Sequence, residues 1–359
     1  MKKTWAGSLV VNSLPEGCSM CMKGEKLVLF VTGLCRRGCF YCPLSRQRRG
    51  RDVVYANERP VERDDDLLEE AELMDAKGAG LTGGDPLLKP QRTLHYVKML
   101  KEKFGEAFHI HLYTTTGPHV DRKVIKELVK LGLDEMRFHP LLDAEDPWLS
   151  CIRVASDEGL TVGLEVPAVP GMEERLRELA MVAEELGATF ININELEMNE
   201  ENAFQLRARG FKIKPSSMSG VEGSEDLALR LMEWIEEELS LSAHYCPAFI
   251  KDAYQYRNRL KRKAIRVAKP YEEVTDDGLL RKGVVVGDFK FLQGLKHSLT
   301  ESLGLATDMV SLDPSRGVLE LPVEVLKIAK KLGRLKGVDA FIVEEYPTYD
   351  RRLSSYLPI

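Results

Sequence analysis

The stretch KLVLFVTGLCRRGCFYC, residues 26–42, joins an apolar run to three cysteines in the spacing C-x3-C-x2-C. The run at 26–31 has the composition of a buried strand, so Cys35, Cys39 and Cys42 are expected on the loop that follows it. Thiolates are the usual ligands of iron–sulfur clusters, and a 4Fe–4S cluster commonly has four. Three close cysteines would therefore leave one iron free to bind another group.

Outward from this stretch, short apolar runs alternate with amphipathic segments of helical periodicity. Strands alternating with helices indicate a parallel sheet. We expect an α/β fold with a partial (β/α)6 barrel, although an open doubly wound sheet fits the periodicity almost as well. In a barrel, the cysteine loop would lie at the strand C-termini, where such enzymes place their sites. The six expected strands are 26–31, 78–83, 109–113, 133–139, 161–167 and 189–196.

With Phe40 and Tyr41 just before its last cysteine, the triplet resembles that of the radical S-adenosylmethionine (radical SAM) superfamily. The resemblance implies that Cys35, Cys39 and Cys42 are catalytic and bind a 4Fe–4S cluster whose open iron chelates SAM. One-electron reduction, from a donor such as ferredoxin or flavodoxin, would cleave SAM to a 5′-deoxyadenosyl radical that abstracts hydrogen from a substrate. The alternative is a structural zinc knuckle, but zinc sites usually pair C-x2-C with a distant second pair.

The resemblance extends to a second strand end and implies further SAM-binding residues. LTGGDP at 81–86 is similar to the superfamily's GGEP motif, with aspartate in place of the usual glutamate. Glu165 lies in the otherwise apolar run GLEVP, where an unpaired carboxylate would be costly. We expect Arg137 to pair with the SAM carboxylate, and Glu165 or Asn194 to hold the ribose. The complete expected set is Tyr41, Gly83, Gly84, Asp85, Pro86, Thr115, Arg137, His139, Glu165 and Asn194.

Three further cysteines form a second candidate metal site. Cys18 and Cys21 make a C-x2-C turn before the first strand, and Cys246 follows His244 by two residues. If the barrel brings these segments together, the four side chains would make a Cys3His zinc site. Alternatively, the three cysteines would bind a second 4Fe–4S cluster with an open iron.

The last third of the chain has a different composition. Residues 251–269 hold eight basic residues against one acidic residue, in a chain of net charge −5. Such a stretch would attract phosphates and suggests RNA binding. The order strand–helix–strand–strand–helix–strand follows, which suggests a small α+β ferredoxin-like domain. The expected divisions are an N-terminal extension at 1–25, a barrel at 26–245, a basic linker and helix at 246–280 and the ferredoxin-like domain at 281–359.

The functional expectation combines these features. The sequence contains no apolar stretch long enough for a membrane helix or signal peptide, so a cytoplasmic location is the default expectation. The compact core resembles that of glycyl-radical-enzyme activases, and most of all a group of archaeal proteins related to pyruvate formate-lyase activating enzyme. We expect a radical SAM enzyme, with tRNA as the first choice of substrate. The alternatives are an activase that generates a glycyl radical on a partner protein, and a non-catalytic iron–sulfur protein.

Overall fold

The structure is a computed structural model that describes residues 1–359. The chain forms two compact units. The first comprises Met1–Glu72 and Ala76–Tyr256, and the second comprises Leu73–Asp75 and Arg257–Ile359. None of the helices combines the length and the apolar character needed to cross a bilayer.

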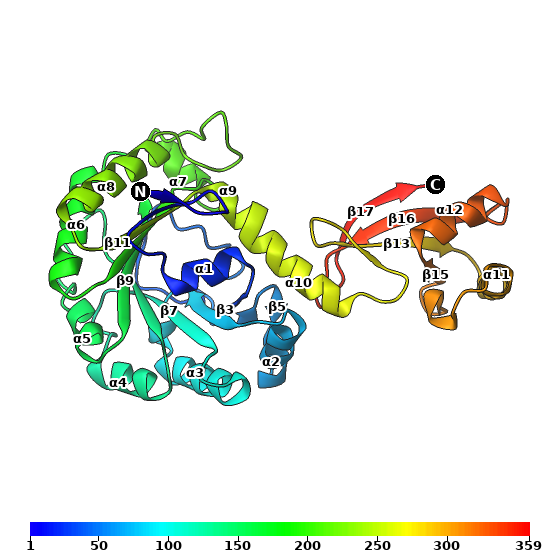
Figure 1. The fold of residues 1–359 in the computed structure, drawn as a ribbon, viewed down its shortest axis with the longest axis horizontal. Coiled ribbons are helices and arrows are strands. Elements are labelled where there is room, and N and C mark those ends of the chain that lie inside the picture. Colours follow the sequence, from blue (N-terminus) through cyan, green and yellow to red (C-terminus); the bar gives the residue numbers. More distant parts are fainter. The chain divides into compact units, whose positions relative to one another are not determined.

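The first unit is built on a sheet of eleven strands, of which seven consecutive neighbours run parallel. Figure 1 shows these strands with helices around their outer side. The two outermost parallel strands pair with short antiparallel strands and not with each other, so the barrel is incomplete. In sheet order the parallel strands are β3 (Lys26–Thr32), β6 (Gly78–Gly83), β7 (His109–Thr115), β8 (Glu135–His139), β9 (Thr161–Ala168), β10 (Phe190–Glu195) and β11 (Ser242–Cys246).

Short antiparallel strands extend both edges of this sheet. On one side β2 (Leu9–Val11) pairs with β11 and then with β1 (Lys2–Lys3). On the other side β4 (Tyr55–Ala56) pairs with β3 and then with β5 (Arg59–Pro60). The expected N-terminal extension, residues 1–25, thus contributes β1 and β2 to the sheet of the first unit.

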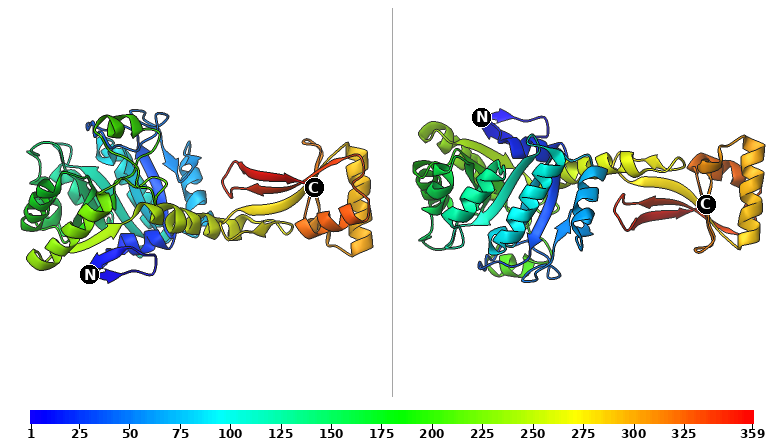
Figure 2. Two further views of the ribbon diagram at one scale, coloured as in Figure 1. Left: turned by 90° about the horizontal axis from the view of Figure 1, so that it is seen from above. Right: turned by 90° about the horizontal axis from the view of Figure 1, so that it is seen from below.

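Helices connect the parallel strands, as the alternation in the sequence predicts, and the two views of Figure 2 show them covering the sheet of the first unit. Helix α4, for example, buries Ile125 and Leu128 on one face. The longer helices are α2 (Asp64–Leu73), α3 (Pro90–Phe104), α4 (Arg122–Lys130), α5 (Cys151–Asp157), α6 (Glu173–Glu185), α7 (Ala203–Ala208) and α8 (Ser224–Glu238). The shorter ones are η1 (Pro86–Leu88), α9 (Ala248–Ile250) and the π-helical turn η2 (Lys251–Tyr256).

One helix, α1 (Glu16–Met22), lies against the inner side of the sheet instead. A Cβ atom on Gly17 would lie 2.5 Å from Nδ1 of His111 on β7 and 2.8 Å from Nη2 of Arg137 on β8. Glycine at this position lets the helix backbone approach both strands closely. The helix carries Cys18 and Cys21 into the interior of the unit.

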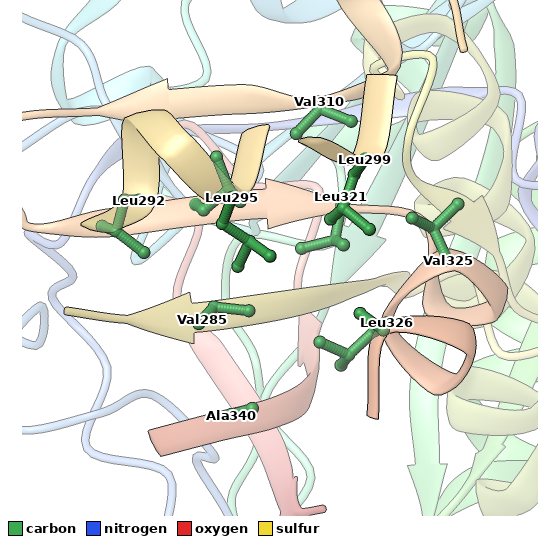
Figure 3. Close-up of a cluster of buried hydrophobic side chains, with 11 residues drawn as sticks. Val285, Leu292, Leu295, Leu299, Val310, Leu321, Val325, Leu326 and Ala340 are labelled. Carbon is green, nitrogen blue, oxygen red and sulfur yellow. The ribbon is translucent and has the colours of Figure 1, made fainter. Parts of the chain in front are cut away.

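The second unit is an antiparallel sheet with two helices packed on it. Its strand order is β14-β15-β13-β16-β17, and β12 also pairs with β13. Figure 3 shows the core, in which Val285, Leu321 and Ala340 of the sheet meet leucines of both helices. The elements are α10 (Arg257–Val267), β12 (Glu273–Val274), β13 (Leu280–Val286), α11 (Phe289–Leu303), η3 (Thr307–Met309), β14 (Ser311–Asp313), β15 (Val318–Leu321), α12 (Val323–Lys331), β16 (Asp339–Glu345) and β17 (Leu353–Pro358).

The predicted order of strands and helices in this unit is present from β13 to β16. The ferredoxin-like assignment itself stays a prediction. The expected linker at 246–280 is not one segment, because Cys246 ends β11, η2 belongs to the first unit and α10 begins the second.

Several charges of the basic stretch have acidic partners. Arg262 and Arg266 both bind the Asp75 carboxylate at 2.8 Å, and Lys261 lies 3.5 Å from Asp276. Lys263 is buried. The stretch is therefore less available to an anionic ligand than its composition suggests.

Candidate active site

A cavity of about 590 Å³ opens at the C-terminal ends of the parallel strands. On four strands, residues two positions apart both line its wall, because alternate residues of a strand share one face. These pairs are Tyr113 and Thr115, Arg137 and His139, Asn192 and Asn194, and His244 and Cys246. The loop after β3 and helix α1 also form part of the wall, and six of the seven cysteines of the chain line this one cavity.

The loop that carries Cys35, Cys39 and Cys42 is held by contacts to its neighbours. The Gly33 amide donates to the Arg51 carbonyl at 2.8 Å. The Arg37 guanidinium donates to the Thr116 carbonyl at 2.6 Å and lies 3.2 Å from the buried Asp146 carboxylate. All three cysteines are free thiols that face the cavity, as a shared ligand set requires.

The glycine pair supports this loop through its backbone. The Gly84 amide donates to the Thr32 carbonyl, and the Asp85 amide donates to the Leu34 carbonyl, both at 2.7 Å. A Cβ atom on Gly84 would lie 2.2 Å from the Leu34 oxygen, which leaves no room for a side chain. Gly83 and Gly84 also line the cavity, as the sequence predicts for a ligand-binding turn.

Asp85 and Pro86 are not among the residues that line the cavity. The buried Asp85 carboxylate accepts hydrogen bonds from the Thr114 hydroxyl at 2.9 Å and the Thr115 hydroxyl at 2.6 Å, and it lies 2.8 Å from His119 Nε2. Burial alone would raise its pKa, but the bonds from His119 and Thr115 outweigh burial and hold the pKa below its ordinary value. Asp85 therefore positions β7, and its predicted contact with SAM has no support from its location.

Arg137 and Glu165 form a buried charged network on the cavity wall. Arg137 donates to Glu135 at 2.5 Å and to Glu165 at 3.0 Å, while its Nη2 atom is buried without a partner. The second carboxylate oxygen of Glu165 accepts from the side-chain amides of Asn192 at 2.6 Å and Asn194 at 2.7 Å. These bonds fix Arg137, Glu165, Asn192 and Asn194 relative to one another. The Nη2 atom of Arg137 remains available to donate to a ligand.

His139 links Tyr41 to the same network. Its Nδ1 atom lies 2.8 Å from the Glu165 carbonyl, which can only accept, so Nδ1 carries the proton. Burial lowers the pKa of His139, so the ring is neutral near pH 7. Its Nε2 atom therefore accepts the hydrogen bond from the Tyr41 hydroxyl, at 2.9 Å.

The second cysteine group also reaches the cavity. Cys18 and Cys21 come from α1 and Cys246 ends β11. Burial raises the pKa of the Cys246 thiol to about 12. As the side chains stand, no three histidine, cysteine or acidic groups converge on a point that could hold a single metal ion, and this holds for the first triplet as well.

Among the wall residues that sequence reasoning missed are Tyr113, Asn192, Lys251 and Gln255. Tyr113 and Asn192 lie two positions before the predicted Thr115 and Asn194, so strand alternation could have identified them. Lys251 and Gln255 belong to η2, and no sequence signal pointed to them. Cys151 is buried in α5 and does not line the cavity.

A parallel incomplete barrel with a three-cysteine loop at its C-terminal rim defines a class of iron–sulfur enzymes, and comparison with known proteins names the class. The radical SAM superfamily profile matches residues 29–180. A protein of Methanocaldococcus jannaschii named "Putative glycyl-radical enzyme activating enzyme" is 39% identical over 360 residues, covering 97% of this chain and 93% of the relative. The chain belongs to the radical SAM superfamily.

Among solved structures, the chain is similar to HydG, a maturase of the FeFe-hydrogenase. The sequence identity is 14%, the TM-score is 0.38, and the likeness covers 71% of this chain and 69% of HydG. That TM-score is too low to support an inference.

Proposed function

We propose that this radical SAM enzyme is an activase that takes a hydrogen atom from a glycine of a partner protein. The cavity supports the radical SAM part, because the cysteine triplet and the glycine pair line one space at the strand ends. The name of the relative, which is similar over nearly the whole chain, supports a protein substrate.

The residues present fit a 4Fe–4S cluster and SAM. Cys35, Cys39 and Cys42 supply three thiolates, and the unpartnered Nη2 of buried Arg137 offers a donor to an anionic group such as the SAM carboxylate. When bound, the cluster supplies the electron that cleaves SAM reductively, which provides the radical for hydrogen abstraction. Ferredoxin or flavodoxin is the electron donor we infer.

The chain's own residues would order this site before any ligand arrives. Asn192 and Asn194 hold Glu165, Glu165 holds Arg137, and the carbonyl of Glu165 fixes the ring of His139. Such prior ordering lowers the reorganisation needed on binding. Tyr41, Thr115, His139, Glu165 and Asn194 are the remaining residues we assign to SAM.

A protein substrate is preferred here to tRNA, the first choice from sequence. The basic stretch carried the tRNA prediction, and Arg262, Arg266 and Lys261 have carboxylate partners within the second unit. These three basic side chains do not line the cavity, so they give no support for a nucleic-acid substrate at the site.

The experiment is anaerobic reconstitution with iron and sulfide, followed by SAM and dithionite. We expect release of 5′-deoxyadenosine, and its loss when Cys35, Cys39 and Cys42 are all changed to alanine. The reaction is then repeated with total tRNA or with a protein that carries a glycyl-radical sequence. A glycyl radical seen by electron paramagnetic resonance (EPR) on the protein supports the proposal.

Two results would contradict it. Undiminished 5′-deoxyadenosine from the triple variant would show that the assigned cysteines do not hold the cluster. A mass change in tRNA, without a radical on any protein tested, would show that the substrate is RNA and not a protein.

A further inference from the structure

We propose that Cys18, Cys21 and Cys246 bind a second iron–sulfur cluster in the same cavity, with His244 as its fourth ligand. This site is additional to the cysteine triplet and does not depend on whether the substrate is a protein.

Two distant parts of the chain bring the three thiols to one place. Cys18 and Cys21 are three residues apart on α1, so they lie on the same side of that helix. Cys246 is the last residue of β11, a strand at the far end of the parallel run from β3. All three line the cavity, and Cys246 packs in one buried cluster with Met22, the residue that follows Cys21 on α1.

His244 has the hydrogen-bonding state of a histidine prepared to bind a metal. Its Nδ1 atom lies 2.5 Å from the Asn192 side-chain oxygen, which can only accept, so Nδ1 carries the proton. The Nε2 atom therefore presents a lone pair, and it is buried with no partner while the residue lines the cavity. Metal-binding histidines commonly donate their other ring N–H to such an acceptor.

Asn192 connects this histidine to the cysteines. Its oxygen also accepts a contact from the Cys18 thiol at 3.5 Å, and its amide nitrogen is held by Glu165 at 2.6 Å. The amide therefore cannot turn over without breaking the bond to Glu165. It keeps Cys18 and His244 close to each other, as two ligands of one metal group must be.

Two basic residues, Arg137 and Lys251, line the same cavity as these thiols. Cations at these positions would offset the negative charge that a cluster and its thiolate ligands bring.

A cluster suits this arrangement better than zinc. Three thiolates and an imidazole are also a zinc ligand set, but they must then converge on one ion. In a 4Fe–4S cluster each ligand binds a different iron, so the ligands surround the group. The four side chains all line the cavity, as those of the first triplet do, without converging on a single point.

The test separates the two sites by removing the first. The variant C35A/C39A/C42A, reconstituted anaerobically with iron and sulfide, should retain about four irons per chain and the visible absorption of a cluster. Adding C246A should remove both. Adding C151A instead is the matched control, because Cys151 is buried outside the cavity and its loss should leave the iron unchanged.

A triple variant that binds no iron, or that holds zinc after purification with both metals present, would overturn the proposal. Should the quadruple variant be insoluble, C18A/C246A in the otherwise unchanged protein gives the same answer, because its iron content should fall by about half. Unchanged iron in that variant would reject the site. His244→Ala in the triple variant should alter the EPR spectrum of the reduced cluster, and an identical spectrum would remove His244 from the ligand set.

Loss of the first site and loss of the second have different readouts. The triplet variant should fail to release 5′-deoxyadenosine while it keeps iron. Failure of the activase proposal would instead appear as the absence of a glycyl radical in the fully reconstituted protein.

Discussion

Asp85 connects the cysteine loop after β3 to the end of β7, and both line the cavity. Its backbone amide binds the cysteine loop at Leu34, while its side chain accepts from Thr114 and Thr115 of β7. One residue thus sets the position of the cysteine loop relative to a wall of the predicted SAM pocket. A short carboxylate suffices for these contacts, which gives the replacement of the motif's usual glutamate a structural reason.

Asp85→Asn should therefore destabilise the apo-protein by about 2 kcal/mol at pH 7, because an amide replaces an acceptor-only group and leaves buried donors unpaired. The pKa of Asp85 is lowered from 3.8, so its ionised form stabilises the fold above that pH, and this contribution disappears as pH falls through the lower folded value. The difference between wild type and variant, measured by urea unfolding, should thus shrink below about pH 4.

The control for this change is Asp121→Asn at the N-cap of α4, where the side chain accepts from Lys123 and asparagine caps equally well. That variant should change the free energy of unfolding by less than about 0.5 kcal/mol. An Asp85→Asn effect as small as the control's would mean that the carboxylate does not brace the site.

At the level of elements, the position of the cysteine loop depends on its backbone contact with Gly84 and Asp85, which follow β6. Gly84→Ala would place a Cβ atom 2.2 Å from the Leu34 oxygen, so the loop must move. We expect a loss of about 1–3 kcal/mol in the free energy of unfolding. The iron content after reconstitution should fall as well, because Cys35 follows Leu34 directly.

Gly38→Ala offers the comparison within the same loop. No atom lies within 4 Å of a Cβ at Gly38, and its φ is not in the left-handed region. Iron binding and stability should be nearly unchanged. Equal iron content in the two variants, measured on the same preparation, would show that close backbone contact at Gly84 does not position the cysteines.

Elements with a clear apolar period could be predicted from the sequence, and those without one could not. All six expected strands are present near their expected positions. The seventh parallel strand, β11, was missed because its five residues, SAHYC, place histidine and cysteine at inward positions where a buried strand usually has apolar residues. Without that strand, the sequence gives no position for Cys246 in the sheet. The packing of Cys246 against Met22 of α1 therefore could not be derived from it.

The candidate site shows the same division. The cysteine triplet and the glycine pair can be identified from the sequence because their spacing is that of known ligand-binding motifs. Tyr113 and Asn192 belong to no such motif, and they lie two positions before the strand-end residues Thr115 and Asn194. Composition groups Lys251 with the basic stretch at 251–269, but Lys251 lines the cavity. The reason is that the first unit includes η2, and the second unit begins only at Arg257.

For the whole molecule, every residue that lines the cavity belongs to the first unit. The second unit has its own core, formed by its sheet and the helices α11 and α12. SAM cleavage without a partner should therefore need only the first unit, while the second is open to another role. This separation can be tested by ending the chain at Tyr256.

The truncated protein 1–256 should bind the same amount of iron per chain as the full chain. It should release 5′-deoxyadenosine at a rate within about tenfold of the full chain, equivalent to about 1.4 kcal/mol in the barrier. Some loss of stability is expected, because Leu73–Asp75 at the end of α2 groups with the second unit and loses partners such as Arg262. A soluble, iron-loaded 1–256 protein that released no 5′-deoxyadenosine would show that the second unit takes part in SAM cleavage, against the separation inferred from the cavity.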